Sequence, residues 1–215
     1  MVRLGILLTQ QHRLLSVAAL LDVFEAVNRF YESDGKEYFF DISFLHPHSS
    51  TPIAYSDHPV YPLNEAPQQD IILIPSFSAT DIPIAIHVNH ECIPWLQQQH
   101  RQGAEIASFC TGAFLLAATG LLDKKPATTH IQAAGALANA FPQVDVKASE
   151  ITTYYQGIYT SGGATNSFHL MLRLIEKYCG HEMTVRTAKY FAIDMNREQQ
   201  AYFSTFRPIH NHKDE

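Results

Sequence analysis

Short apolar runs alternate along this chain with amphipathic helical patterns, and this alternation limits the folds available to it. Residues 71–74 are apolar at every position, and residues 2–8 are nearly so. A strand with one solvated face alternates polar and apolar residues, so a continuous apolar run indicates a strand buried on both faces. Apolar side chains recur with helical spacing over residues 17–31. The pattern therefore predicts an α/β fold, a mostly parallel sheet with helices on both faces.

The other expected elements follow from the same periodicities and from turn residues. Residues 47–67 contain five prolines, so we expect loops and at most edge strands there. The glycines of Ser161-Gly162-Gly163 predict a tight turn before a helix. We expect strands at 2–8, 38–45, 71–74, 104–108 and 127–130, a hairpin of 151–155 with 158–161, and helices ending near Gly35, at 88–102, 113–122, up to 140, up to Gly180 and at 182–192.

Composition and charge exclude several functions for this chain. Its 215 residues carry a formal net charge of −6 and no run of Lys and Arg, which argues against a nucleic-acid-binding surface. Three widely spaced cysteines do not indicate a disulfide framework. No apolar stretch approaches the roughly 20 residues of a membrane span. We expect a cytoplasmic protein without membrane contact, metal or cofactor, since the histidine pairs lack other ligands at zinc-like spacing.

Residues 104–112, Ala-Glu-Ile-Ala-Ser-Phe-Cys-Thr-Gly, place Cys110 where a buried strand turns into a helix. A side chain at such a turn lies at the carboxyl end of the sheet, above the first N–H groups of the helix. The positive end of the helix dipole favours the thiolate, and Gly112 allows close backbone approach. These residues fit two interpretations, a nucleophile on a strained elbow and an inert cysteine in an α/β core.

Several polar segments follow predicted strands and are expected at the same edge of the sheet. Ser76, Phe77 and Ser78 follow residues 71–74, Cys110 follows residues 104–108, and His130 ends residues 127–130. Open α/β sheets bind ligands outside the carboxyl ends of their strands. The topology therefore predicts a site at this edge that includes Cys110.

The stretch Ser-Phe-Cys-Thr-Gly-Ala-Phe-Leu-Leu-Ala-Ala-Thr-Gly-Leu-Leu-Asp at 108–123, followed by Ala-Thr-Thr-His at 127–130, resembles the ThiJ/PfpI superfamily, which is related to class I glutamine amidotransferases. Residues 161–180 and 188–200 are similar to the sensor domains at the N-terminus of AraC-type transcriptional regulators. The resemblance covers nearly the whole chain. It implies a flavodoxin-like or Rossmann-like three-layer sandwich.

The resemblance also implies a domain organisation. Residues 1–206 correspond to the sensor domain, and residues 207–215 to the start of a linker. A helix-turn-helix DNA-binding domain is expected after this linker and is absent from the sequence, so we expect a longer regulator that contacts DNA only through that part. The partners implied by the resemblance are a small-molecule effector and a second copy of the chain in a homodimer.

Two departures from the resemblance bear on activity. Catalytic relatives resemble one another in a Glu or Asp after the first strand, and the resemblance places Ser16 there, which cannot act as a general base near neutral pH. They also carry Pro-Gly-Gly where this chain has Pro75-Ser76-Phe77, and such glycines let N–H groups hold an oxyanion. Phe77 is expected to form an aromatic wall of the pocket instead. We therefore predict a protein that keeps the pocket and has lost catalysis.

The preferred hypothesis is a ligand-sensing and dimerisation domain that binds a small polar metabolite, for instance a nitrogenous one. The residues expected to line its site are Cys110, Thr111, Ser16, Phe77, Ser78 and His130. The alternative is a stand-alone cysteine-dependent amidase, hydratase or glyoxalase-like enzyme that uses Cys110 and His130. A third hypothesis is redox sensing by Cys110. His130 equally fits a helix-start histidine held by local backbone.

Overall fold

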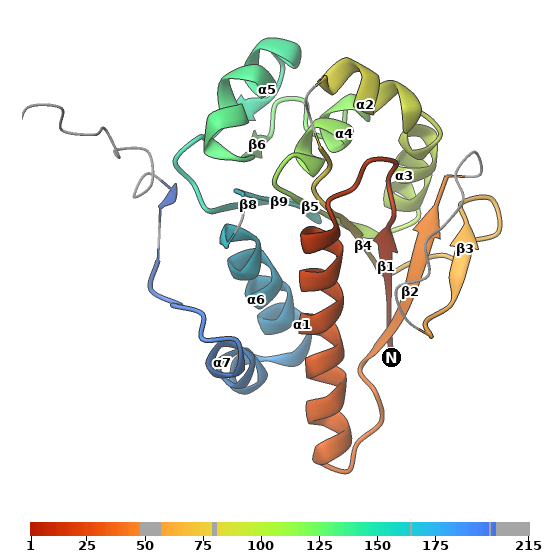
Figure 1. Cartoon of the computed structure of the whole chain (residues 1–215), viewed down its shortest axis with the longest axis vertical. Helices are drawn as coiled ribbons and strands as arrows, with labels where there is room; N and C mark the ends of the chain where they lie inside the picture. The colour runs from red at the N-terminus through yellow and green to blue at the C-terminus, as the bar shows by residue number, and fades with distance from the viewer. Residues whose placement is uncertain (48–56, 79–80, 164, 198, 201–215) are drawn as a thin grey trace, which may run out of the picture.

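The computed structural model describes residues 1–47, 57–78, 81–163, 165–197 and 199–200, and the predicted linker at 207–215 lies outside them. Within this part of the chain, seven strands form one sheet in the order β3-β2-β1-β4-β5-β9-β8, and every neighbouring pair except β8 and β9 is parallel (Figure 1). The strands are β1 (Val2–Leu7), β2 (Phe40–His46), β3 (Val60–Pro62), β4 (Ile71–Ile74), β5 (Glu105–Phe109), β8 (Thr152–Tyr155) and β9 (Ile158–Ser161), and the short β6 (Pro126–Ala127) and β7 (Asp145–Val146) pair separately.

Helices cover both faces of the sheet, which confirms the predicted fold class. The helices on one face are α1 (Leu14–Ser33), α6 (Asn166–Cys179) and α7 (His181–Tyr190), and those on the other are α2 (Ile82–Val88), α3 (Cys92–Arg101) and α4 (Gly112–Ala118). The 3₁₀ turn η1 (Ile131–Ala133) and α5 (Ala134–Ala140) lie beside β6 at the carboxyl edge of the sheet.

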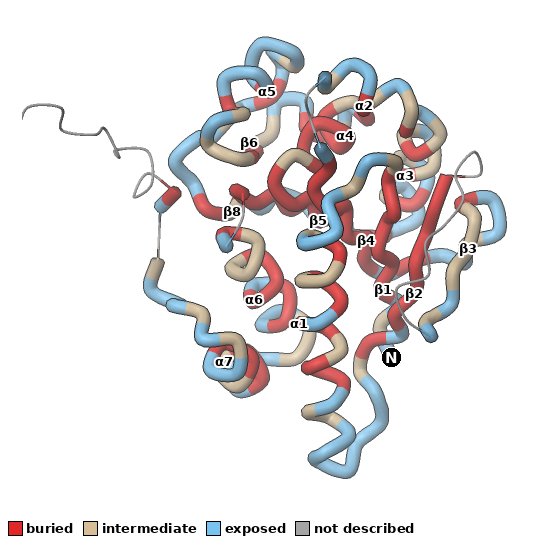
Figure 2. The backbone as a smooth tube through the Cα atoms, in the orientation of Figure 1, coloured by how far each residue is buried: buried red, intermediate tan, exposed pale blue. Residues whose placement is uncertain are grey.

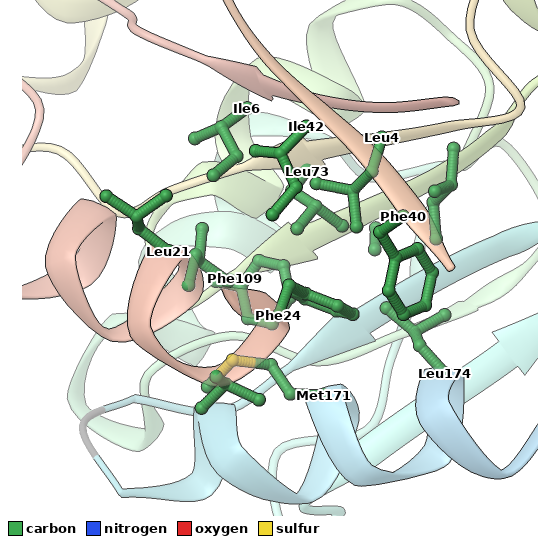
Figure 3. Close-up of a cluster of buried hydrophobic side chains, with 14 of the residues drawn as sticks. Leu4, Ile6, Leu21, Phe24, Phe40, Ile42, Leu73, Phe109, Met171 and Leu174 are labelled. Atoms are coloured by element: carbon green, nitrogen blue, oxygen red, sulfur yellow. The ribbon is translucent and has the colours of Figure 1, made fainter. Parts of the chain in front are cut away.

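The core consists of two apolar layers, one on each face of the sheet. All four residues of β4 are buried, as expected of a strand covered on both sides. Alternate side chains of each strand enter opposite layers, because successive residues of a strand point to opposite faces. Figure 3 shows one layer, where Leu4 and Ile6 of β1 meet Phe24 of α1 and Met171 of α6. In Figure 2 the buried residues follow the strands and the inner sides of α1 and α6.

Most predicted elements are present, with shifted ends. The hairpin of β8 and β9 is confirmed, and its turn residues Gln156 and Gly157 have φ of 45° and 79°, as a two-residue type I′ turn requires. The described residues of the proline-rich stretch hold only the short edge strand β3, as predicted. Residues 48–56 of that stretch lie outside the described part.

Two helix predictions need correction. The helix expected at 88–102 begins later, at Cys92 of α3, and a separate helix that was not expected, α2, lies ahead of it and ends at Val88. The side chain of Asp81 caps α2 by accepting from the N–H of Ile84 at 3.1 Å, and this signal in the sequence was overlooked. The helix expected at 113–122 ends at Ala118, ahead of Gly120, which has a φ of +73°.

None of the helices in the described ranges is long and apolar enough to cross a membrane. The same residues contain no group of three or more His, Cys, Asp or Glu side chains that could hold a metal ion.

Candidate functional site

Cys110 lies at the turn between β5 and α4 and has a left-handed backbone, with a φ of +54°. Few non-glycine residues adopt this conformation, which costs conformational energy and persists only where the surroundings enforce it. Two hydrogen bonds do so here. The Cys110 N–H donates to the carbonyl of Ser161 at 3.1 Å, and the Thr129 hydroxyl donates to the carbonyl of Cys110 at 2.8 Å. The turn therefore has the strained geometry of a nucleophile elbow.

Gly112 lets the elbow pack directly against the end of β4. A Cβ at this position would lie 2.7 Å from the carbonyl oxygen of Ile74 and 2.9 Å from that of Pro75. Both are backbone atoms and cannot move aside like the tip of a flexible side chain. The close approach expected from the sequence is therefore present, and it sets Cys110 beside the loop that follows β4.

Two hydroxyl groups hold the loop that follows β4. The hydroxyl of Ser16, on α1, accepts a hydrogen bond from the N–H of Ser76 at 3.0 Å. Thr111 accepts the N–H of Phe77 at 3.0 Å and donates to its carbonyl oxygen at 2.8 Å. Ser16 thus occupies a structural position at the carboxyl edge of the sheet, where its hydroxyl fixes the loop.

His130 begins the turn η1 and is fixed by its own neighbours. Its Nδ1 accepts the backbone N–H of Gln132 at 3.2 Å, as the side chain of an N-cap residue does. Since Nδ1 accepts, the neutral ring carries its proton on Nε2. The ring also packs against Gly163, where an added Cβ would overlap its atoms. The helix-start interpretation of His130 is thus met, and the ring still faces the cavity described next.

A cavity of about 680 Å³ opens at this edge of the sheet. It brings together Ser16, Cys110, Thr111 and His130 of the predicted site. The other lining residues are Arg13, Leu15, Ala19, Leu20, Ser76, Ile82, Gln132, Ala133, Ala136, Thr165, Ser167, Phe168 and Met171. The volume lies within the range of about 300–1,000 Å³ that is typical of small-molecule sites.

Phe77 and Ser78 lie outside this cavity lining, so the predicted aromatic wall at Phe77 is wrong. The backbone of Phe77 donates a hydrogen bond to the Thr111 hydroxyl and forms an isolated antiparallel β-bridge with His12. Its ring is buried in the core layer on the face of the sheet covered by α2, α3 and α4. Ser78 is exposed, and its N–H donates to the carbonyl of Gln11 at 2.9 Å. Phe168 of α6 provides the aromatic wall instead.

The contributions of α1 and α6 to the cavity were not expected from the sequence. Arg13 directly precedes α1, and Phe168 and Met171 lie on the first turns of α6. Their positions held a usable signal, because both helices follow strands whose carboxyl ends lie at the predicted site.

The other two cysteines, Cys92 and Cys179, are expected to be poor nucleophiles near neutral pH. Burial raises the pKa of Cys92 to about 12 and that of Cys179 to about 12, so both remain thiols near neutral pH. None of the three cysteines forms a disulfide. Cys110 differs from them by its place on the wall of the cavity.

Comparison with known proteins gives a family and a fold. Residues 55–177 match the DJ-1/PfpI family. The HTH-type transcriptional regulator GbdR of Pseudomonas aeruginosa (strain UCBPP-PA14) is 29% identical over 137 residues, which cover 64% of this chain and 36% of that regulator. The chain thus spans well under half of the length of this curated relative.

Two solved structures share the fold at low sequence identity. A putative transcriptional regulator protein from Vibrio parahaemolyticus superposes with a TM-score of 0.74 at 21% identity, covering 88% of this chain and 98% of that chain. An AraC family transcriptional regulator from Pseudomonas putida gives a TM-score of 0.70 at 16% identity, covering 89% of this chain and 100% of that one. At these identities the likeness concerns the fold alone.

Proposed function

The chain belongs to the DJ-1/PfpI family, and we propose that it is the ligand-sensing domain of an AraC-type transcriptional regulator, which binds a small molecule beside Cys110 without transforming it. One observation carries the proposal: the cavity is present, but Ser16 stands where a catalytic acid is expected and is bonded to Ser76. No Asp or Glu belongs to the cavity lining in the described part of the chain.

The orientation of His130 also supports binding over catalysis. A general base needs a free lone pair directed at the proton that it removes. The Nδ1 lone pair of His130 accepts the Gln132 N–H, and Nε2 of the neutral ring carries a proton. In this orientation the ring offers the cavity a hydrogen-bond donor, which suits the binding of a ligand.

In this proposal, a part of the regulator that this chain does not cover contacts DNA. The match to GbdR, a regulator of the HTH type by name, covers 36% of that protein, and the chain has a net charge of −6. A homodimer in the cytoplasm belongs to the same proposal. Ligand binding would regulate if the ligand prefers one of two dimer arrangements, since only differential affinity shifts such an equilibrium.

A metabolite screen with a cavity-filling variant tests this function. Ala136→Phe adds a ring at the exposed rim of the cavity, and Ala138→Phe adds the same ring on α5 outside the lining. We expect some compounds to raise the melting temperature of the wild type and of Ala138→Phe but not of Ala136→Phe. NMR of the recovered compound should show it unchanged. Compounds that raise the melting temperature of Ala136→Phe as much as that of the wild type would overturn the assignment of this cavity.

A cysteine-dependent enzyme is the second candidate, and the strained elbow favours it. The positive φ of Cys110 is the conformation that a nucleophile elbow requires. Turnover of a bound compound that disappears in Cys110→Ala would establish this alternative and contradict the sensor proposal. Binding that persists in Cys110→Ala without turnover in the wild type supports the sensor.

A further inference from the structure

The described lining of the cavity has a net positive charge. Arg13 is the one permanently charged residue among the described lining residues, and none of them is acidic. Within the described part of the chain, no carboxylate forms an ion pair with the Arg13 guanidinium. An exposed, unpaired cation thus stands at the mouth of the cavity, although the whole chain has a net charge of −6.

Neutral polar residues of the same cavity lining add donors. His130 has Nε2–H as its remaining polar ring group, because Nδ1 accepts from Gln132. The side-chain amide of Gln132 and the hydroxyl of Ser167 also line the cavity. The amino ends of α1 and α6 lie at the same place, and their dipoles add partial positive charge to a site that already contains a cation.

Part of the buried lining of the cavity is apolar. Leu20 of α1 is fully buried, as is Met171 of α6, and Phe168 lies beside them on α6. Such a wall is stabilised by contact with hydrocarbon and offers no partner to a second charge. A ligand that fits both regions has a charged head at the rim and an apolar body inside.

We infer that the ligand of this cavity is a small monocarboxylate with an apolar body, whose carboxylate pairs with Arg13 and accepts from His130. The inference rests on the proposed ligand-sensing function. An ammonium group in this place would lie near Arg13 without a counter-ion from the described lining, which makes its desolvation costly. A dianion would bring a second charge to a site with one permanent cation.

Matched probes that differ only in the polar head test the ligand class. Butyrate and benzoate carry the carboxylate, butyramide and benzamide are neutral, and butylamine and benzylamine are cationic. Titration calorimetry at low salt would measure each probe against the wild type, Arg13→Ala, Arg101→Ala and Ala136→Phe. Arg101 is exposed at the end of α3 and outside the lining, so its variant controls for net charge.

We expect each carboxylate to bind about tenfold or more tightly than its amide, which is the size of one charge-assisted contact. Arg13→Ala should abolish this preference, Arg101→Ala should keep it, and added salt should reduce it. An amine that binds as tightly as the carboxylate, or an unchanged preference in Arg13→Ala, would overturn the inference. Absence of carboxylate binding would overturn it too. Binding of amides or amines that is lost in Ala136→Phe would leave the sensor proposal standing.

Discussion

The backbone of Cys110 shows how one residue can carry information that its burial does not. Its exposed fraction of 9% would suit an inert core cysteine, as would its apolar neighbours. The φ of +54° does not suit that interpretation, because a core cysteine gains nothing from a strained conformation. The strain is held by Ser161 and Thr129 on either side. At this scale the elbow is a feature of the cavity wall.

Cys92 gives a prediction for alkaline pH. Burial raises its pKa from 9.0 to about 12 in the folded protein. Its raised folded pKa stabilises the protein below pH 9, and this contribution is lost as the pH rises towards 12, because the unfolded thiol ionises first. Between pH 8 and pH 10 we expect the wild type to lose roughly 1 kcal/mol of unfolding free energy through this residue.

Urea denaturation at the two pH values measures this loss, with Cys92→Ala as the reference. The variant removes a buried side chain and is destabilised at both pH values, so the comparison uses only the difference between them. The pH-dependent loss should be smaller in Cys92→Ala by roughly 1 kcal/mol. Equal losses in both proteins would show that Cys92 ionises in the folded state as readily as in the unfolded one.

At the scale of elements, the junction between β9 and α6 joins the sheet to the site. Gly162 and Gly163 were expected to form a tight turn, yet neither has a positive φ. Their function is close approach: a Cβ on Gly162 would overlap the carboxamide of Gln200, and one on Gly163 would overlap the ring of His130. The sequence could not reveal this, because the groups that need the space come from distant parts of the chain.

Gly163→Ala should therefore act through His130. We expect it to destabilise the protein by about 1–3 kcal/mol, the usual cost of overpacking, and to displace the imidazole from the cavity. In a His130→Ala background most of this cost should disappear, because the overlapping ring is gone. Chemical denaturation of the four proteins in this double-mutant cycle measures the coupling.

Gly135→Ala is the control for a glycine without such a neighbour. Gly135 lies in α5, and an added Cβ would meet no atom within 4 Å. This variant should be neutral or more stable by about 0.5 kcal/mol, since alanine is the better helix former. A cost of Gly163→Ala that is unchanged without the His130 ring would contradict the assigned contact.

At the scale of the whole molecule, the fold was predictable from the sequence to a greater extent than the site. Residues 71–74 and the helical spacing over 17–31 fix a parallel sheet with two helical layers, because burial on both faces allows little else. Parallel topology then placed Cys110 and His130 at one edge. The directions of individual side chains were not predictable: the Phe77 ring enters the core and Phe168 lines the cavity. Tertiary contacts determine these directions, and the local pattern of polar and apolar residues does not predict such contacts.

Gln200 connects three distant parts of the molecule near the end of the described chain. Its side chain is 2% exposed and its amide donates to the carbonyl of Glu150 at 2.8 Å and of Thr129 at 3.0 Å, and to the Thr128 hydroxyl at 2.9 Å. Its carbonyl oxygen accepts from Asn166 of α6 at 3.0 Å. Thr129 in turn donates to Cys110. The segment that leads towards the predicted linker is thus attached directly to the backbone of the site.

The chemistry of this attachment distinguishes two substitutions. Gln200→Ala removes a donor to the carbonyl of the buried Thr129 and the acceptor of the Asn166 amide, and should cost about 1–3 kcal/mol. Gln200→Glu should cost more at pH 7, because a carboxylate would face the oxygens of Thr129 and Glu150. That carboxyl would have a raised pKa in the folded state, so its penalty should shrink as the pH falls from 7 towards 5.

Denaturation at pH 7 and pH 5 measures this change in the penalty, with Gln199→Glu at the exposed neighbouring position as the control. A Gln200→Glu protein as stable as Gln199→Glu at pH 7 would show that Gln200 is not held at the site.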